Sequence, residues 1–150
     1  LFAVLRDHSI LGRPARDAGE SVDPGAAARA FRRGLEVARD SGPAGVTARL
    51  FTARSLFLTG DLTAAATLDY LSGLLIGEEL RSGLAAAATG TPIALIGDPA
   101  LCSRYRDAFA VFGLSDVQTC GDTSPAGLWQ VATAAGLVSN ATTPGSTTRG

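Results

Sequence analysis

The sequence predicts a mixed α/β fold in which helices predominate. Apolar residues recur at helical spacing from the start of the chain to about residue 87. The continuous apolar run Ile93–Ile96 then replaces this pattern, and such a run is typical of a strand buried on both faces of a parallel sheet. A helix, a second short apolar segment and a last helix follow. Residues 91–137 are therefore expected to form a strand-helix-strand-helix unit behind a helical part at residues 1–90.

The helical part begins with residues 1–5, whose spacing fits the end of a helix, and continues into a polar, loop-like stretch at residues 13–22. The next helix has the clearest signal. Asp23 is placed to cap it and Pro24 occupies its first turn, and the sequence Ser-Gly-Pro at residues 41–43 ends it. Two further helices are expected at residues 46–58 and 63–87.

The remaining elements are marked by glycine and proline. Gly97-Asp98-Pro99 turns the chain from the first strand into a helix that ends near Gly113, a second strand is expected within residues 114–120, and a last helix follows residue 121. Tyr105 and Trp129 lie on or beside apolar stripes and are expected in the core or at its edge. Residues 1–138 are expected to form one domain, and residues 139–150 a disordered tail.

The composition excludes several classes of protein. The chain has 150 residues and a formal net charge of −1, so it lacks the basic excess of a nucleic-acid binder. All 13 basic residues are arginine, which excludes a Walker-type phosphate loop and any enzyme that needs a catalytic lysine. The single histidine, His8, excludes a metal site built on several histidines. No apolar stretch approaches the roughly 20 residues that span a bilayer.

The cysteine content indicates a cellular compartment for the chain, and its first residue indicates that it is part of a longer product. Cys102 and Cys120 are too few for a disulfide scaffold and have no metal-ligand spacing, which fits reduced thiols in a cytoplasmic protein. The chain contains no methionine and begins at Leu1, so we expect it to be part of a longer product.

The turn Gly97–Ala100 is the best candidate for a binding site. In open parallel sheets, ligands bind beyond the carboxyl ends of strands, where a glycine lets a ligand approach the backbone. A carboxylate at Asp98 would repel phosphate, so a nucleoside contact is favoured over a phosphate cradle. The alternative is a helix capped by Asp98 without any ligand.

Several other residues have both a structural and a functional interpretation. Gly73 and Gly77 lie on one face of the third expected helix, where a second backbone or a ligand could approach closely. His8 and Ser9 follow Asp7, but neighbours in sequence rarely form a catalytic triad, so a turn is favoured. Arg54 lies beside an apolar face and could pair with a buried carboxylate or reach an anionic ligand. The adjacent Glu78 and Glu79 are expected to be solvated.

Parts of the sequence resemble the 2-dehydro-3-deoxygalactonokinase family. The resemblance spans roughly residues 1–137 in the family's order. Its most specific segments are Asp69–Leu80 and Ile93–Tyr105, and it is extended by Leu1–Leu5, His8–Gly12, Phe51–Arg54 and Ala126–Trp129.

This resemblance implies the C-terminal lobe of an actin-like, ribonuclease-H-like kinase with two lobes and ATP bound between them. It implies transfer of the ATP γ-phosphate, with Mg²⁺, to the 6-hydroxyl of 2-dehydro-3-deoxy-D-galactonate. The segment Ile96–Ala100 matches the strand and turn that contact adenosine in such kinases, although Asp98-Pro99 stands where many relatives have a second glycine. The phosphate loop of the other lobe has no counterpart here, so the catalytic and metal-binding carboxylates are expected in an N-terminal lobe that this chain lacks.

The candidate nucleotide-binding residues are therefore Gly97, Asp98, Pro99 and Ala100, together with Gly73 and Gly77. His8, Ser9 and Arg54 are candidate substrate or cleft residues, and no catalytic residue or metal ligand is assigned within the chain. The expected partners are ATP, the sugar acid and the N-terminal lobe, with no nucleic acid or membrane. The alternative function is a non-catalytic α/β domain that binds a ligand or partner through the Gly73/Gly77 face.

Overall fold

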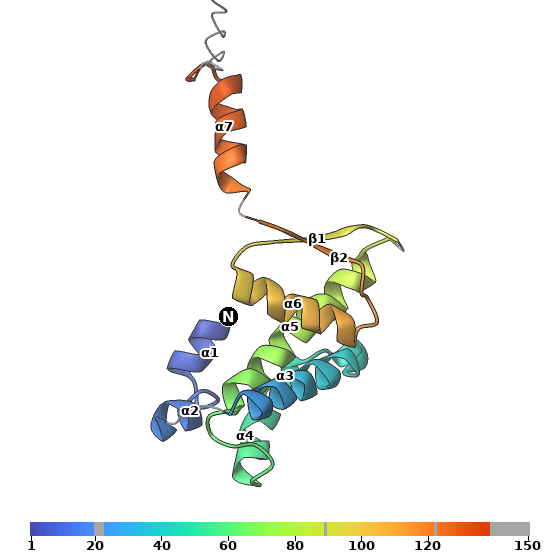
Figure 1. Ribbon diagram of the computed structural model, residues 1–150. Helices are drawn as coiled ribbons and strands as arrows, with labels where there is room; N and C mark the ends of the chain where they lie inside the picture. The colour runs from blue at the N-terminus through green and yellow to red at the C-terminus, as the bar shows by residue number, and fades with distance from the viewer. Residues whose placement is uncertain (20–22, 89, 122, 139–150) are drawn as a thin grey trace, which may run out of the picture.

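A computed structural model describes residues 1–19, 23–88, 90–121 and 123–138 (Figure 1). It shows a helical body, a two-stranded parallel sheet above it and one helix that projects away. The elements are α1 (Phe2–His8), α2 (Arg13–Ala18), α3 (Pro24–Arg39), the 3₁₀ turns η1 (Gly42–Ala44) and η2 (Thr47–Arg49), α4 (Thr52–Leu58), α5 (Thr67–Ala86), β1 (Ile93–Ile96), α6 (Pro99–Val111), β2 (Val117–Cys120) and α7 (Ser124–Ala134).

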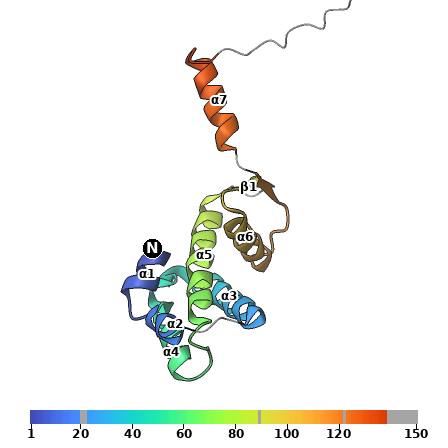
Figure 2. The ribbon, with the colours of Figure 1, turned by 60° about the vertical axis from the view of Figure 1, so that its left-hand side comes forward.

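Helix α5 is the centre of the body and contacts α1, α2, α3, α4 and α6 (Figure 2). Helix α3 packs directly against α5, and each of the two opposite surfaces of this helix pair contributes to a hydrophobic core. On one surface, Ala30 of α3 and Tyr70 and Leu74 of α5 belong to a core shared with α4. On the other, Leu35 of α3 and Leu80 of α5 belong to a core shared with α6 and the sheet. The pair α3–α5 is thus a middle layer, which explains why α5 is apolar on more than one side.

The close crossing depends on glycine. A side chain added at Gly34 or Gly73 would collide with the backbone of the facing helix: its Cβ at Gly34 would lie 3.0 Å from the Cα of Gly73, with the carbonyl oxygen of Tyr70 closer still. A Cβ at Gly77 would lie 2.6 Å from that of Ala38. Of the two interpretations of Gly73 and Gly77, a second backbone is the one that the structure shows.

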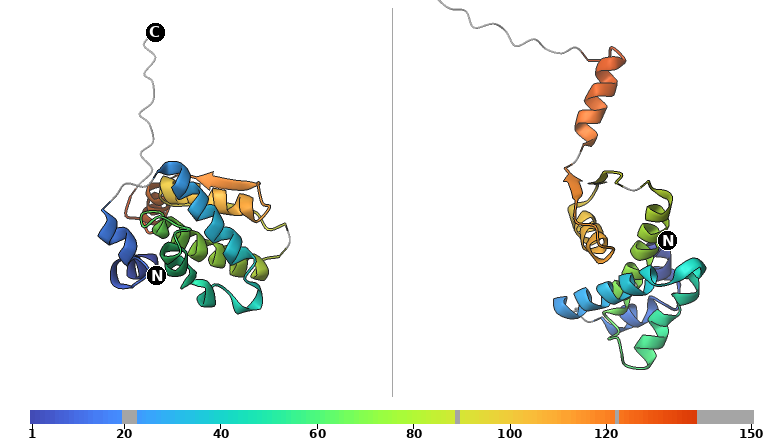
Figure 3. Two further views of the ribbon diagram at one scale, coloured as in Figure 1. Left: turned by 90° about the horizontal axis from the view of Figure 1, so that it is seen from below. Right: turned by 90° about the vertical axis from the view of Figure 1, so that its right-hand side faces the viewer.

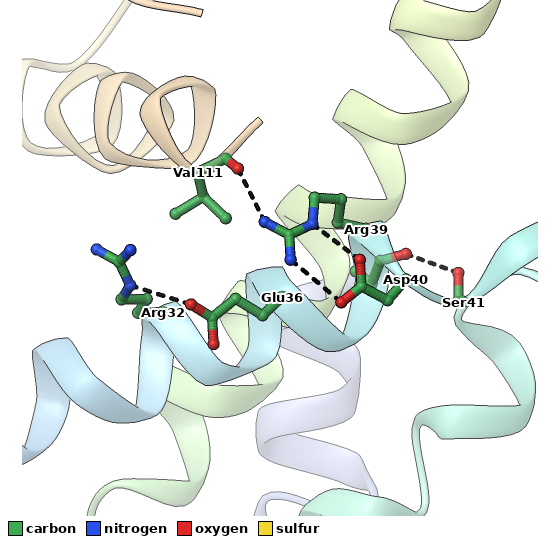
Figure 4. A network of polar contacts seen from close by, with 7 residues as sticks. Arg32, Glu36, Arg39, Asp40, Ser41 and Val111 are labelled. Carbon is green, nitrogen blue, oxygen red and sulfur yellow. Dashed lines mark hydrogen bonds and ion pairs between the residues drawn. The ribbon is translucent and has the colours of Figure 1, made fainter. Parts of the chain in front are cut away.

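A polar network joins α3 to α6 at their C-terminal ends (Figure 4). The guanidinium of Arg39 donates to the backbone carbonyl of Val111 over 3.1 Å and also pairs with Asp40. Two turns before Arg39, Arg32 pairs with Glu36 over 3.1 Å along the exposed side of α3. Arg39 therefore connects the end of α6 to the middle layer.

Most of the expected elements are confirmed, with corrections near their ends. Residues 13–18 form α2 rather than a loop, because Pro14 suits a first helical turn and Arg13 pairs with Asp17 one turn later. The helix expected at 46–58 is divided into η2 and α4, and α5 begins at Thr67 rather than near residue 63. The expected disorder at residues 139–150 lies outside the described residues.

The sheet differs from expectation in its burial. β1 and β2 pair in parallel, as predicted, with Ile93 opposite Val117, but only one face of β1 is covered, and Ile96 is 62% exposed. Helix α7 projects away from the body, as the right-hand view of Figure 3 shows, and Trp129 is exposed rather than at a core edge. Among the helices of the described residues, none combines the length and the apolar character that a bilayer crossing requires.

Candidate functional site

A groove of about 860 Å³ lies between α1, α5 and α6, and Val46, Thr47 and Leu50 in and around η2 also line it. We call it the α1–α5–α6 groove. Its walls are largely aliphatic, with Leu68 and Leu75 from α5 and Leu101 from the first turn of α6. Polar side chains at its edges come from Arg6, Asp69, Ser72, Glu79, Arg104 and Tyr105.

The turn Gly97–Ala100 directly precedes Leu101, which lines this groove, but none of the four residues of the turn lines it. Gly97 has a φ of 151°, which favours glycine, and a Cβ there would meet nothing within 4 Å. The Asp98 side chain accepts a hydrogen bond from the backbone N–H of Leu101 over 3.0 Å and so fixes the groove-lining turn of α6. Because Pro99 has no N–H and Asp98 occupies that of Leu101, this helix end has little left to offer a phosphate.

An ion pair crosses the groove. Arg104 of α6 pairs with Asp69 of α5, whose side chain is only 12% exposed, and the guanidinium also stacks 5.0 Å from the ring centre of Phe31 on α3. One cation thus holds three helices together. Sequence analysis did not single out this pair. Asp69 and Arg104 are 35 residues apart, and no sequence pattern indicates a contact over that separation. Both residues nevertheless fall within the segments that resemble the kinase family.

Tyr105 and Glu79 form a second bridge between α6 and α5. The tyrosine hydroxyl donates to the Glu79 carboxylate over 2.6 Å. Burial of the ring, reinforced by that carboxylate, raises the pKa of Tyr105 to about 12, so the hydroxyl remains protonated at neutral pH. The charged groups of the groove are thus largely paired with one another, which favours a flat, uncharged ligand over a polyanion.

Glu78 is engaged in the structure, although the sequence suggested a solvated side chain. Its carboxylate pairs with Arg81 over 2.6 Å and accepts the backbone N–H of Val46 over 3.1 Å, which joins the η2 segment to α5. The Arg81 guanidinium in particular lowers the pKa of Glu78.

This shift predicts a loss of stability in acid. A carboxyl whose pKa is lower in the folded than in the unfolded state stabilises the fold above its unfolded pKa, and that contribution disappears as the pH falls through the folded value. We expect Glu78→Gln to reduce the dependence of the unfolding free energy on pH below about pH 4.5. Urea unfolding across that range measures it, and Glu36→Gln, in an exposed helical pair, serves as the control. Parallel pH profiles for wild type and Glu78→Gln would contradict the prediction.

The other candidate residues lie elsewhere. His8 is exposed at the end of α1, and the Ser9 hydroxyl donates to the Leu5 carbonyl over 2.5 Å and accepts from the Leu11 N–H, which is the turn role favoured from the sequence. Arg54 is half-buried in a separate cavity of about 470 Å³ together with Arg13 and other residues of α2. The structure does not bring these residues together with Gly97–Ala100.

The assignment of Gly73 and Gly77 as nucleotide-binding residues is corrected by the structure. The space in front of them is filled by α3, so no ligand reaches this face in the described fold. Within the described part of the chain there is also no group of three or more His, Cys, Asp or Glu side chains placed to hold a metal ion.

Comparison with known proteins agrees with the resemblance in the sequence. The profile of a family described as 2-keto-3-deoxy-galactonokinase matches residues 1–131. A 2-dehydro-3-deoxygalactonokinase from Escherichia coli (strain K12) is 32% identical over 124 residues, which are 83% of this chain and 40% of the relative. A crystal structure of a Sinorhizobium meliloti protein, provisionally assigned as a 2-dehydro-3-deoxygalactonokinase, superposes with a TM-score of 0.75 at 30% identity, covering 89% of this chain and 44% of that one. The chain thus spans less than half the length of these relatives.

Proposed function

The chain belongs to the 2-keto-3-deoxy-galactonokinase family, and from this premise we propose that it carries the nucleotide-side lobe of an ATP-dependent sugar-acid kinase. The substrate proposed is 2-dehydro-3-deoxy-D-galactonate, phosphorylated on its 6-hydroxyl, and the lobe is proposed to be of the actin-like type. The observation that supports the proposal is the α1–α5–α6 groove, whose lining residue Leu101 directly follows the glycine turn at the end of β1.

In this proposal the groove binds the nucleoside part of ATP. Its aliphatic walls suit the faces of a purine, and Gly97 allows the ligand to approach the backbone without a side chain in the way. Ala100 keeps the first turn of α6 thin, and the protonated hydroxyl of Tyr105 is a neutral polar group at the edge. These residues bind and orient the nucleotide, which is the larger part of what a protein contributes to phosphoryl transfer.

The rest of the chemistry is proposed to come from residues outside this chain. Transfer breaks the bond between the γ-phosphorus and the oxygen that leaves with ADP, forms a bond to the sugar 6-oxygen, and requires a base for the hydroxyl proton. The carboxylates of the groove do not fit a Mg²⁺ site, since Asp69 is paired with Arg104 and Glu78 with Arg81. We therefore expect the chain alone to produce no ADP when given ATP, Mg²⁺ and the sugar acid, and ADP formation dependent on the sugar acid would overturn this.

Binding of adenosine to the chain tests the groove itself. Leu101→Glu places a charge in the groove at a side chain that is already 50% exposed, and we expect it to weaken adenosine affinity at least 10-fold, corresponding to about 1.4 kcal/mol. The matched control is Leu58→Glu on α4, where the leucine is 64% exposed and outside the groove. Calorimetry gives the affinities, and amide chemical shifts of Gly97 and Ala100 locate the ligand. Equal affinity for the two variants would remove the groove as the nucleotide site.

The alternative, a non-catalytic domain that binds a partner through Gly73 and Gly77, loses its basis in the structure. Helix α3 already occupies that face.

A further inference from the structure

A cavity of about 470 Å³ between α2 and α4 lies outside the site described above. It shares no lining residue with the α1–α5–α6 groove. Figures 1 and 2 show α2 and α4 at the end of the helical body that is away from the sheet. The cavity is therefore remote from the strands and from the turn that follows β1. We call it the α2–α4 cavity.

Arg54 of α4 lines the α2–α4 cavity and is half-buried. In the described part of the chain no ion pair includes its guanidinium. Asp17 is the one carboxylate among the described residues that line the cavity, and it pairs with Arg13 over 3.2 Å. A guanidinium that is partly withdrawn from water costs free energy unless an anion compensates its charge. Of the two interpretations of Arg54 from the sequence, an anionic ligand is thus the one that the cavity favours.

The packing of α4 on α5 holds Arg54 in place. Ala53, the residue before it, is fully buried. The hydroxyls of Thr52 in the same turn and of the buried Tyr70 on α5 share a hydrogen bond of 2.8 Å. These contacts fix the turn of α4 that carries Arg54, so part of the ordering cost of binding is met before a ligand arrives.

The charges and walls of the cavity favour a small organic carboxylate. Two arginines, Arg13 and Arg54, and one aspartate line it, which gives a net charge of +1. That charge balances one carboxylate, whereas a phosphate monoester carries about −1.5 to −2 at neutral pH. A guanidinium can also form two parallel hydrogen bonds with a carboxylate. Phe57 and Ala64 supply apolar surface for the carbon atoms of such a ligand.

We propose that the α2–α4 cavity binds a small organic carboxylate whose carboxylate group is held by Arg54. Two sources share this chemistry, namely the sugar acid proposed as the substrate and any other small carboxylic acid. The inference does not rest on the proposed function, because it follows from the charges of a cavity that the nucleotide groove does not share.

A titration followed by amide chemical shifts tests the site. The probes are D-gluconate, 2-dehydro-3-deoxy-D-galactonate, neutral sorbitol and inorganic phosphate. We expect at least one of the two carboxylates to shift the amides of Arg54 and Phe57, sorbitol to leave them unchanged, and phosphate to bind more weakly. Binding of the sugar acid alone would make the proposed substrate the ligand, and binding of both acids would show that the carboxylate is recognised by itself. Binding of neither acid, an equal response to sorbitol, or tighter binding of phosphate would overturn the proposal.

Three variants assign the binding to Arg54. Arg54→Gln should weaken carboxylate binding by about 10-fold or more. The matched control is Arg49→Gln, which removes the same charge from an exposed arginine of η2 outside the cavity and should bind as the wild type does. Asp17→Asn removes the negative charge of the cavity and releases Arg13, so it should tighten binding. Equal affinities for the Arg54 and Arg49 variants, or weaker binding by Asp17→Asn, would contradict the assignment.

Urea unfolding separates ligand binding from a structural role of Arg54. Without ligand, Arg54→Gln should unfold at the same urea concentration as the wild type or a higher one, since it removes a partly buried charge that has no counter-charge. The carboxylate that binds should raise the midpoint of the wild type and leave that of Arg54→Gln unchanged. A lower midpoint of the variant without ligand would make Arg54 a structural residue and overturn the proposal. Carboxylate binding without adenosine binding sinks only the proposed function, and the reverse sinks only this inference.

Discussion

Replacing Gly73 by alanine is expected to lower the free energy of unfolding by about 3 kcal/mol, the upper end for an overpacked core. The added Cβ would lie 3.1 Å from the Cα of Gly34 and closer still to the carbonyl oxygen of Phe31, which is backbone and cannot rotate away. The two helices would have to separate, and both cores that they share would loosen. Urea denaturation followed by circular dichroism measures the change.

Gly83→Ala on the same helix is the matched control. It makes the same substitution where a Cβ meets nothing within 4 Å, so only helix propensity changes, and alanine should raise stability by up to about 1 kcal/mol. The two substitutions should therefore have opposite signs. Similar effects at both positions would contradict the close crossing of α3 and α5.

The second large effect is expected at the Asp69–Arg104 ion pair. Arg104→Gln removes the cation and leaves the nearly buried Asp69 carboxylate without its partner. Complete burial would make such a loss cost about 3–5 kcal/mol, but the Arg104 side chain is 40% exposed, so we expect about 2 kcal/mol. The contact of the guanidinium with the Phe31 ring is lost as well. Urea unfolding of the single variants gives the two costs.

A double-mutant cycle separates the pair from its surroundings. Asp69→Asn with Arg104→Gln should cost less than the sum of the two single changes by about 1–2 kcal/mol. Arg32→Gln in the exposed pair with Glu36 should cost no more than about 0.5 kcal/mol. If the Arg104 and Arg32 variants had equal effects, the ion pair would not be what fixes α6 on α5.

The parts of the fold that follow from local rules were predictable. Asp23 and Asp98, each followed by proline, mark the first turns of α3 and α6, and in both the carboxylate accepts a backbone N–H three residues on. The apolar run at Ile93–Ile96 gave the first strand and its parallel pairing. These signals are contained within a few consecutive residues, which is why sequence alone is enough to find them.

The candidate site was predictable only in part. The turn at Gly97–Ala100 was found from its position after a strand, and the next residue, Leu101, lines the groove, whereas the turn itself does not. The opposite wall of that groove was not found, because Asp69 and Arg104 meet through the crossing of α5 and α6. Gly73 was assigned to nucleotide binding because two glycines on one helix face indicate that something approaches the helix closely. The pattern does not distinguish a ligand from a second helix.

The sequence by itself determined the order of the elements, their capped ends, the parallel strand pair and the family to which the chain belongs. Only the tertiary structure decided which surfaces are occupied. It placed α3 against Gly73, paired Asp69 with Arg104, and left Trp129 and Ile96 exposed. The physical reason is that propensity, capping and periodicity act between residues a few positions apart, whereas burial depends on what the rest of the chain brings to each face.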